Sequence, residues 1–276
     1  MLFDYIGDIH LDFWVKLEHN PVKMRKNIYQ FVQSILPDHP SDTLFIAGDF
    51  GHYNQQSYWL IYYLKEVYET IFFVCGNHDY YLLTKNIKKK YGSSAKRIDE
   101  FVNKASLLEG VYRLDGEVYE HKDILIGGAD MWYDFSYGLK RLGLPYQHVY
   151  EKWWNKSRDS RCHSGLLPTL EHANREKEKV KGMICDIFIS HVPPLSAPIE
   201  VDYMEEDIEI LSFYLFDDSN IFCEKKPLIW LSGHIHQKMN KTVDGLRYLS
   251  QAIGYKDTEK GIIVPERIQT FDMSKL

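Results

Sequence analysis

Short apolar runs mark the chain at residues 2–6, 43–47, 71–75, 185–189 and 228–231. Because nearly every position in them is Ile, Leu, Phe, Val or another apolar residue, the runs are typical of strands that are buried on both faces. Between the first three runs, residues 22–36 and 58–68 show apolar positions at helical spacing. This alternation of strand and helix predicts an α/β fold that starts with a largely parallel sheet.

The pattern changes after residue 110. Residues 111–114, 117–120 and 124–127 are typical of short strands with tight turns, and residues 238–243 and 246–250 flank an Asp-Gly pair that favours a hairpin. We expect these strands to contribute to a second sheet that packs on the first. The sequence therefore predicts a four-layer α/β/β/α sandwich, in which two stacked mixed β-sheets are flanked by helices.

Two long segments fit neither pattern. Residues 129–167 contain eight aromatic residues with six basic and four acidic ones, whereas residues 194–226 contain nine acidic and two basic residues. No internal repeat or low-complexity linker separates them from the rest. We therefore expect a single domain, 1–276, with insertions at about 129–167 and 194–226, the first of which is a candidate cap over a site.

Composition narrows the class of protein. The chain of 276 residues is 45% hydrophobic and 26% charged, which is a globular balance. Its net charge of −6 is unfavourable for non-specific nucleic-acid binding, which depends on basic surface. The cysteines form no C-x-x-C pair, and Cys75 and Cys185 lie in apolar runs, so we expect free thiols in a reducing compartment. With neither a signal peptide nor a span of about 20 apolar residues, a cytoplasmic protein is expected.

Metal-binding residue types follow each of the five apolar runs. In chain order, they are Asp8 with His10, Asp49, Asn77-His78-Asp79, His191, and His234 with His236. Ligands of α/β proteins bind beyond the carboxyl ends of strands, so the five ends should present these side chains at one edge. In extended chain, residues two apart point to the same side, so Asp8 and His10 should converge, as should His234 and His236.

The ligand types also indicate the metal. Three Asp or Asn oxygens and four imidazoles suit borderline divalent ions such as Mn, Fe, Zn or Ni. Seven ligands exceed what one tetrahedral site uses. They divide into two sites of four if one carboxylate is shared.

The ordered blocks D-x-H, G-D, G-N-H-D, H and G-H-x-H resemble those of the calcineurin-like metallophosphoesterase superfamily. Asp49 is followed by Phe50-Gly51-His52, without the Asp-Arg-Gly segment of the phosphoprotein phosphatases. The resemblance is therefore to small phosphoesterases of bacterial or phage type outside that branch.

The resemblance implies a role for each residue of the blocks. Asp8, His10 and His236 would bind one metal, Asn77, His191 and His234 the other, and Asp49 would bridge the two. His78 would face the substrate as a general acid, and Asp79 would orient its ring. The cofactors would be two divalent ions, with Mn favoured and Fe, Zn, Ni or Co as alternatives.

The implied function is metal-dependent hydrolysis of phosphomonoesters or phosphodiesters, including nucleotides, by attack of a metal-bridging hydroxide. One alternative is a DNA or RNA nuclease with the same metals, which the net charge of −6 disfavours. Another is a binding module without catalysis, which the complete ligand set disfavours. The expected partner is a phosphorylated small molecule or nucleotide rather than a membrane.

Candidate substrate-binding residues lie near the blocks. His52 follows the second block, and Trp132 and Tyr133 follow the strand predicted at 124–127. Rings of this kind can stack on a base, so we expect residues 129–167 to fold over the metal edge. The alternative is that these aromatic residues pack in the interior. A cluster of lysines between Lys85 and Lys96 is a nucleic-acid patch or, more simply, a solvated helix face.

Overall fold

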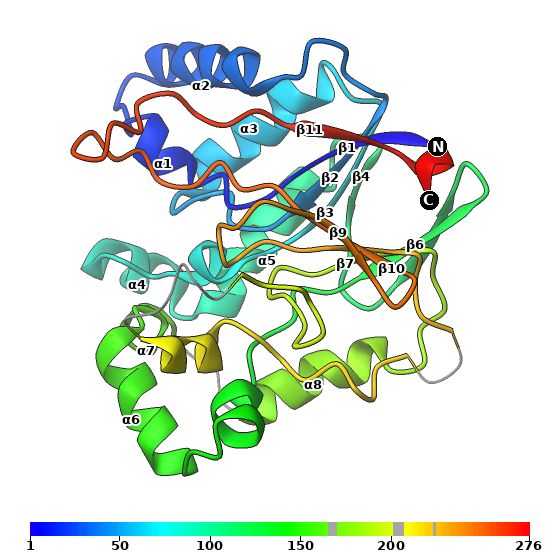
Figure 1. Cartoon of the computed structure of the whole chain (residues 1–276). Helices are drawn as coiled ribbons and strands as arrows, with labels where there is room; N and C mark the ends of the chain where they lie inside the picture. Colours follow the sequence, from blue (N-terminus) through cyan, green and yellow to red (C-terminus); the bar gives the residue numbers. More distant parts are fainter. Residues whose placement is uncertain (165–169, 201–206, 223–224) are drawn as a thin grey trace.

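Two stacked β-sheets form the centre of the structure, a computed structural model that describes residues 1–164, 170–200, 207–222 and 225–276 (Figure 1). The first sheet contains, in spatial order, β11 (Gln269–Asp272), β1 (Leu2–Ile6), β2 (Thr43–Ala47), β3 (Thr70–Val74) and β4 (Val111–Arg113). The second contains β5 (Val118–His121), β6 (Ile124–Gly128), β7 (Ile187–Ile189), β8 (Ile229–Leu231), β10 (Leu246–Ser250) and β9 (Met239–Val243). Neighbouring strands are parallel except at the edges, where β11, β5 and β9 pair antiparallel.

Helices form the two outer layers. On the first sheet lie α2 (Pro21–Ile35), α3 (Asn54–Lys65) and α5 (Ser94–Ala105), and α8 (Leu170–Val180) lies beside the second sheet (Figure 1). Shorter helices are α1 (Leu11–Trp14), η1 (Asn77–Tyr80), α4 (Lys85–Tyr91) and η5 (Met273–Lys275). The predicted α/β/β/α sandwich is thus confirmed.

The interior explains why the strand sequences are continuously apolar. Phe45 and Phe72 of the first sheet pack in one buried cluster with Ile187 and Leu231 of the second. Their chain neighbours, such as Ile46, point to the opposite face and pack under the helices. Because both faces of the central strands are covered, alternate side chains on either face exclude water, and each apolar run is buried along its whole length.

The hairpin of β9 and β10 turns at the predicted Asp-Gly pair. Asp244 has φ 49° and Gly245 has φ 80°, which is the pair of positive values that a type I′ turn requires. The edge strand β11 was not predicted, because only Phe271 of its four residues is buried and its apolar pattern is therefore weak.

The two insertions fold against each other and form what we call the cap. It contains η2 (Tyr137–Arg141), α6 (Tyr146–Lys156) and α7 (Asp159–Cys162) from the first insertion and η4 (Ile208–Phe213) from the second. Ion pairs join the two parts: Lys140 with Asp217, and Lys152 with both Asp207 and Glu209. Their opposite charges therefore reflect a contact between them.

Two sequence expectations concern the chain's environment. Cys75, Cys162 and Cys185 are free thiols in the structure. In the ranges that the structure describes, no helix combines the length and apolarity needed to cross a bilayer.

Glu176 in α8 is a buried acid that should make stability depend on pH. Burial, together with the negative charge of Asp130, raises its pKa from 4.5 to about 7, although Lys179 opposes the shift. The folded chain therefore holds a proton that the unfolded chain releases, so this group's contribution to stability falls as pH rises from about 4.5 to about 7.

We expect Glu176→Gln to have a larger free energy of unfolding than the wild type, by about 3 kcal/mol, at about pH 8 and a nearly equal one at about pH 4. Chemical denaturation at the two pH values measures the difference. A variant whose advantage does not grow with pH would contradict this assignment.

Candidate metal centre

The ends of five strands bring the predicted ligands to one edge of the sandwich. Asp8 follows β1, Asp49 follows β2 and Asn77 follows β3, while His191 and His234 follow β7 and β8 of the other sheet. Because β1, β2 and β3 are parallel neighbours, as are β7 and β8, their carboxyl ends lie together.

The backbone at these strand ends is unusual. Five of the predicted ligands have left-handed φ values: Asp8 (48°), His10 (45°), Asp49 (59°), His234 (70°) and His236 (55°). Such conformations cost non-glycine residues about 1–3 kcal/mol each and cluster at functional sites. Asp8 and His10 do converge, but through a tight turn rather than through the extended chain that we expected. His234 and His236 instead contact different groups, with His234 beside Asn77 and His236 beside His10.

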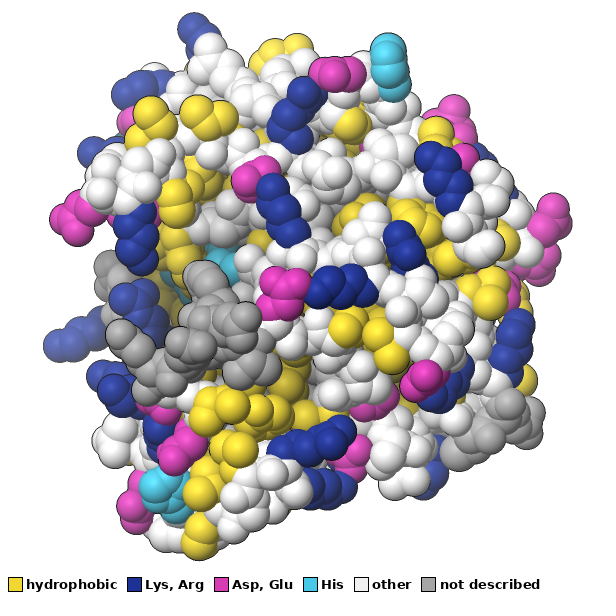
Figure 2. Space-filling view, in the orientation of Figure 1, with side chains coloured by type: hydrophobic (Ala, Val, Ile, Leu, Met, Phe, Trp, Pro, Cys, Tyr) yellow, Lys and Arg dark blue, Asp and Glu magenta, His cyan; other side chains and the backbone are white. Residues whose placement is uncertain are grey.

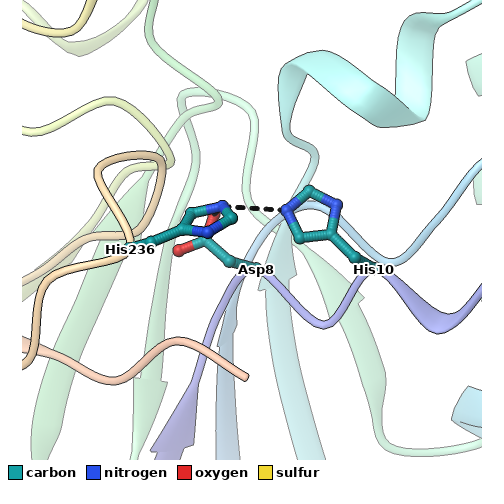
Figure 3. Close-up of side chains that lie close together, drawn as sticks. All are labelled: Asp8, His10 and His236. Carbon is teal, nitrogen blue, oxygen red and sulfur yellow. Dashed lines mark hydrogen bonds and ion pairs between the residues drawn. The ribbon is translucent and has the colours of Figure 1, made fainter. Parts of the chain in front are cut away.

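Asp8, His10 and His236 form the first group of candidate ligands (Figure 3). The Nε2 atoms of His10 and His236 are 3.0 Å apart, and Oδ1 of Asp8 is 3.7 Å from Nε2 of His236. The buried Oδ2 of Asp8 has no hydrogen-bond partner in the described part of the chain. A bound cation would satisfy this buried carboxylate oxygen and would be coordinated by the two imidazoles beside it.

Asn77, His191 and His234 form the second group. Oδ1 of Asn77 lies 3.0 Å from Nε2 of His191 and 3.2 Å from Nδ1 of His234. Oδ2 of Asp49 is 3.5 Å from Nε2 of His191 and also 3.5 Å from Nε2 of His10. The Asp49 carboxylate therefore lies between the two groups, each of which contains three of the other six predicted ligands.

The electrostatics of this cluster fit divalent cations. Burial, followed by the negative charges of Asp79 and Asp8, raises the pKa of Asp49 well above its ordinary value. Burial and neighbouring imidazoles lower the pKa of His10, so that its ring is neutral and its nitrogen free to coordinate. Cations held here would offset the cost of burying the carboxylates, and the mixture of oxygen and imidazole ligands suits Mn, Fe or Zn.

Gly76 makes the close approach at this centre possible. A Cβ at this position would lie 2.2 Å from Oδ1 of Asp49 and 2.6 Å from Cε1 of His191. Any side chain here would therefore displace the shared carboxylate, which gives the glycine of the third block a steric role.

Asp79 does not orient the ring of His78, which corrects the role that the resemblance implied. Oδ2 of Asp79 accepts hydrogen bonds from the backbone N–H groups of Asp49 (3.0 Å) and Gly76 (2.8 Å), and Oδ1 accepts one from Gly51 (3.3 Å). Because residues 77–80 form a tight 3-10 turn, the two side chains leave it in different directions. Asp79 instead fixes the loops after β2 and β3.

The ring of His78 is held by residues outside its own block. Nδ1 of His78 and Nε2 of His52 are 2.9 Å apart, and Nδ1 of His52 is 2.5 Å from Oδ2 of Asp12. On the other side, the Tyr255 hydroxyl is 3.2 Å from Nε2 of His78. Asp12, His52 and Tyr255 thus orient the predicted general acid.

This arrangement revises the role of His52 and adds Asp12 and Tyr255 to the residues of the site. His52 was predicted to meet substrate, but it is buried behind His78 and does not line the cavity. Asp12 stands two positions after His10, so a continuation of the D-x-H spacing could have identified it. Tyr255 follows no motif, and only the fold places it there.

Asp159 of the cap is a further residue that the sequence analysis missed. Its carboxylate accepts hydrogen bonds from Nδ2 of Asn77 (2.9 Å) and the hydroxyls of Tyr81 and Tyr133 (both 2.6 Å). Burial opposes ionisation, but His163 and these hydrogen bonds hold the pKa of Asp159 below its ordinary value. The contact turns Oδ1 of Asn77 towards His191 and connects the cap to the ligand cluster.

A cavity of about 1050 Å³ opens over the centre. It is lined by Asp49, Asn77, His78, His234 and His236, and by cap residues that include Lys156 and Arg158. Figure 2 shows histidine side chains within a hollow of the surface, with Lys and Arg side chains nearby.

Trp132 and Tyr133 do not line this cavity, contrary to their predicted role in substrate binding. They are only 2% and 1% exposed, because the cap covers them. Nε1 of Trp153 in α6 donates to the Tyr133 hydroxyl over 2.7 Å, and the Tyr133 ring lies parallel to that of His234. The alternative of interior packing therefore holds for these two rings, although residues 156–159 of the same insertion do reach the cavity.

Comparisons with known proteins agree with this geometry. Residues 1–238 match the family model described as calcineurin-like phosphoesterase. A protein of Acanthamoeba polyphaga mimivirus, "Uncharacterized protein L509", is 22% identical over 265 residues, which cover 91% of this chain and 90% of that protein. The crystal structure of phosphopantetheinyl hydrolase from Mycobacterium tuberculosis superposes with a TM-score of 0.67 at 18% identity, covering 92% of this chain and 89% of that one.

Proposed function

Because this chain belongs to the calcineurin-like phosphoesterase family, we propose that it hydrolyses phosphate esters with the help of two divalent metal ions. The position of Asp49 carries the proposal. A single carboxylate oxygen is 3.5 Å from an imidazole nitrogen of each ligand group, which is where a bridging ligand belongs. The alternative of a binding module without catalysis lacks a comparable observation in its favour.

Asp8, His10 and His236 would hold one ion, Asn77, His191 and His234 the other, and Asp49 both. When bound, such a pair of ions polarises the phosphoryl group and supplies a nucleophile near neutral pH. The mixture of oxygen and imidazole ligands suits Mn, which we favour, with Fe, Zn, Ni and Co as alternatives.

His78 is the residue placed to move a proton. Its ring lines the cavity next to His10, with ring centroids 4.5 Å apart. Asp12 and His52 hold its Nδ1 side, so Nε2 faces the Tyr255 hydroxyl and the cavity. We assign His78 the donation of a proton to the departing oxygen of the ester.

The cap favours a small phosphorylated molecule over long nucleic acid as substrate. Residues 156–159 form one wall of the cavity and limit its width on that side. The mycobacterial protein that shares the fold is named as a phosphopantetheinyl hydrolase.

The function is tested by stripping the protein of metal and assaying chromogenic phosphomonoesters and phosphodiesters with each candidate ion added back. We expect no hydrolysis without metal and turnover on at least one ester class with Mn. Absence of hydrolysis with every ion, in protein that has bound two ions per chain, would refute the proposal.

A further inference from the structure

Three cationic side chains of the cavity have no anionic partner among the residues that the structure describes. Lys156 and Arg158 lie at the junction of α6 and α7, and Lys256 lies after β10 on a different wall. All three are exposed, and none of their side chains forms an ion pair or hydrogen bond with the described residues. Lys140 and Lys152 of the cap, by contrast, are paired with acids.

The acidic side chains of the same cavity wall, by contrast, accept hydrogen bonds or form ion pairs. Asp159 accepts three hydrogen bonds at the back of the ligand cluster, and Asp207 pairs with Lys152. Asp257 accepts hydrogen bonds from the backbone N–H groups of Glu259 and Lys260. Asp207 is paired with Lys152 and Asp257 lies 3.7 Å from the Lys260 ammonium, whereas Asp159 keeps one negative charge. The three cations therefore still leave a positive balance on the described wall outside the metal ligands, although the whole chain has a net charge of −6.

Two of the cations are next in the chain to residues that contact the candidate site. Lys256 follows Tyr255, whose hydroxyl is 3.2 Å from Nε2 of His78, and Arg158 precedes Asp159, which accepts a hydrogen bond from Asn77. Phe13 and Tyr255 pack with ring centroids 4.6 Å apart, and each presents more than a third of its surface to solvent. A cavity of about 1050 Å³ is larger than one phosphate requires and reaches the size of a nucleotide site.

We propose that Lys156, Arg158 and Lys256 form a second anion site, so that the substrate carries a second phosphate besides the one that is cleaved. The substrate class is an organic bisphosphate, whose middle part would lie against Phe13 and Tyr255. Cationic side chains without partners, facing an open cavity, are the groups that recognise phosphate. The inference rests on the proposed function, because the scissile phosphate must occupy the metal centre.

The experiment compares adenosine 3′,5′-bisphosphate with the 3′- and 5′-monophosphates of adenosine, by calorimetry and by phosphate release. Binding is measured on metal-loaded and metal-free protein, so that one readout does not depend on turnover. The variants are Lys156→Gln, Arg158→Gln and Lys256→Gln. Arg161→Gln is the matched control. Arg161 is exposed on α7, three positions after Arg158, donates to the carbonyl of Asn155 and does not line the cavity.

We expect the wild type to bind the bisphosphate at least about tenfold more tightly than either monophosphate, since each charged hydrogen bond contributes about this factor. Arg158→Gln should lower affinity for the bisphosphate about tenfold and leave the monophosphates within about twofold. Lys156→Gln and Lys256→Gln should act in the same direction, and Arg161→Gln should have no effect.

Equal affinity of the wild type for all three nucleotides would overturn the second anion site. So would equal losses for mono- and bisphosphate, or a loss in Arg161→Gln as large as in Arg158→Gln. If no ester is hydrolysed but calorimetry shows the expected differences, the proposed function fails while the anion site stands.

Discussion

Asp49→Asn is expected to lower turnover by about 10³-fold and to weaken metal binding at both positions, since groups that merely support metal ligands already contribute about 10–100-fold. The substitution removes the one charge that the two ligand groups share. It keeps the side-chain volume and an oxygen that can accept the 2.8 Å hydrogen bond from the His78 backbone N–H. A loss would therefore report on charge and coordination rather than on packing.

The measurement is the number of metal ions per chain after dialysis, together with turnover on a chromogenic ester. Asp38→Asn serves as the control, because Asp38 is an exposed acid that pairs with Arg267 and belongs to neither ligand group. An Asp49→Asn protein that retains two ions and normal turnover would remove the basis for a shared carboxylate.

His78→Gln should keep both metal ions and lower turnover by about 10²–10⁴-fold, the range for loss of a general acid. The reduction should be smaller for an ester with a good leaving group, because that oxygen departs without protonation. His52→Ala should give a smaller loss in the same direction, since His52 and Asp12 orient the ring without reaching the cavity.

Comparing p-nitrophenyl and alkyl phosphates in each variant separates the roles. Equal losses on both esters would mean that His78 binds substrate rather than donating a proton. Loss of metal in His78→Gln would mean that the ring coordinates an ion. The metal content should therefore be measured, because His78 lies close to His10 and Asp49.

The second insertion shows how a sequence feature acquires meaning only in three dimensions. Residues 194–226 are acidic and residues 129–167 are basic, and each could be described separately from the sequence. The ion pairs of Lys140 and Lys152 with acids of the second insertion show that the two oppositely charged segments form one interface. Neither segment indicates its partner, because charge patterns specify sign and not location.

The sequence by itself determined the sandwich and the ligand cluster, because both depend on local patterns. A continuous apolar run specifies a strand covered on both faces, and the strands at residues 2–6 and 43–47 have the predicted bounds. Once such strands are parallel neighbours, the residues after them must meet at one edge. This is why Asp8, Asp49 and Asn77 could be placed together without a structure.

Only the tertiary structure decided what surrounds that cluster. Tyr255 reaches His78 across 177 residues of chain, and Asp159 reaches Asn77 across 82. The Asp79 carboxylate accepts hydrogen bonds from the backbone instead of contacting the His78 ring, because a 3-10 turn sets the direction of its side chain. Such contacts depend on how loops and the cap pack, and packing is selected by shape and burial over the whole molecule, which no spacing between neighbouring residues encodes.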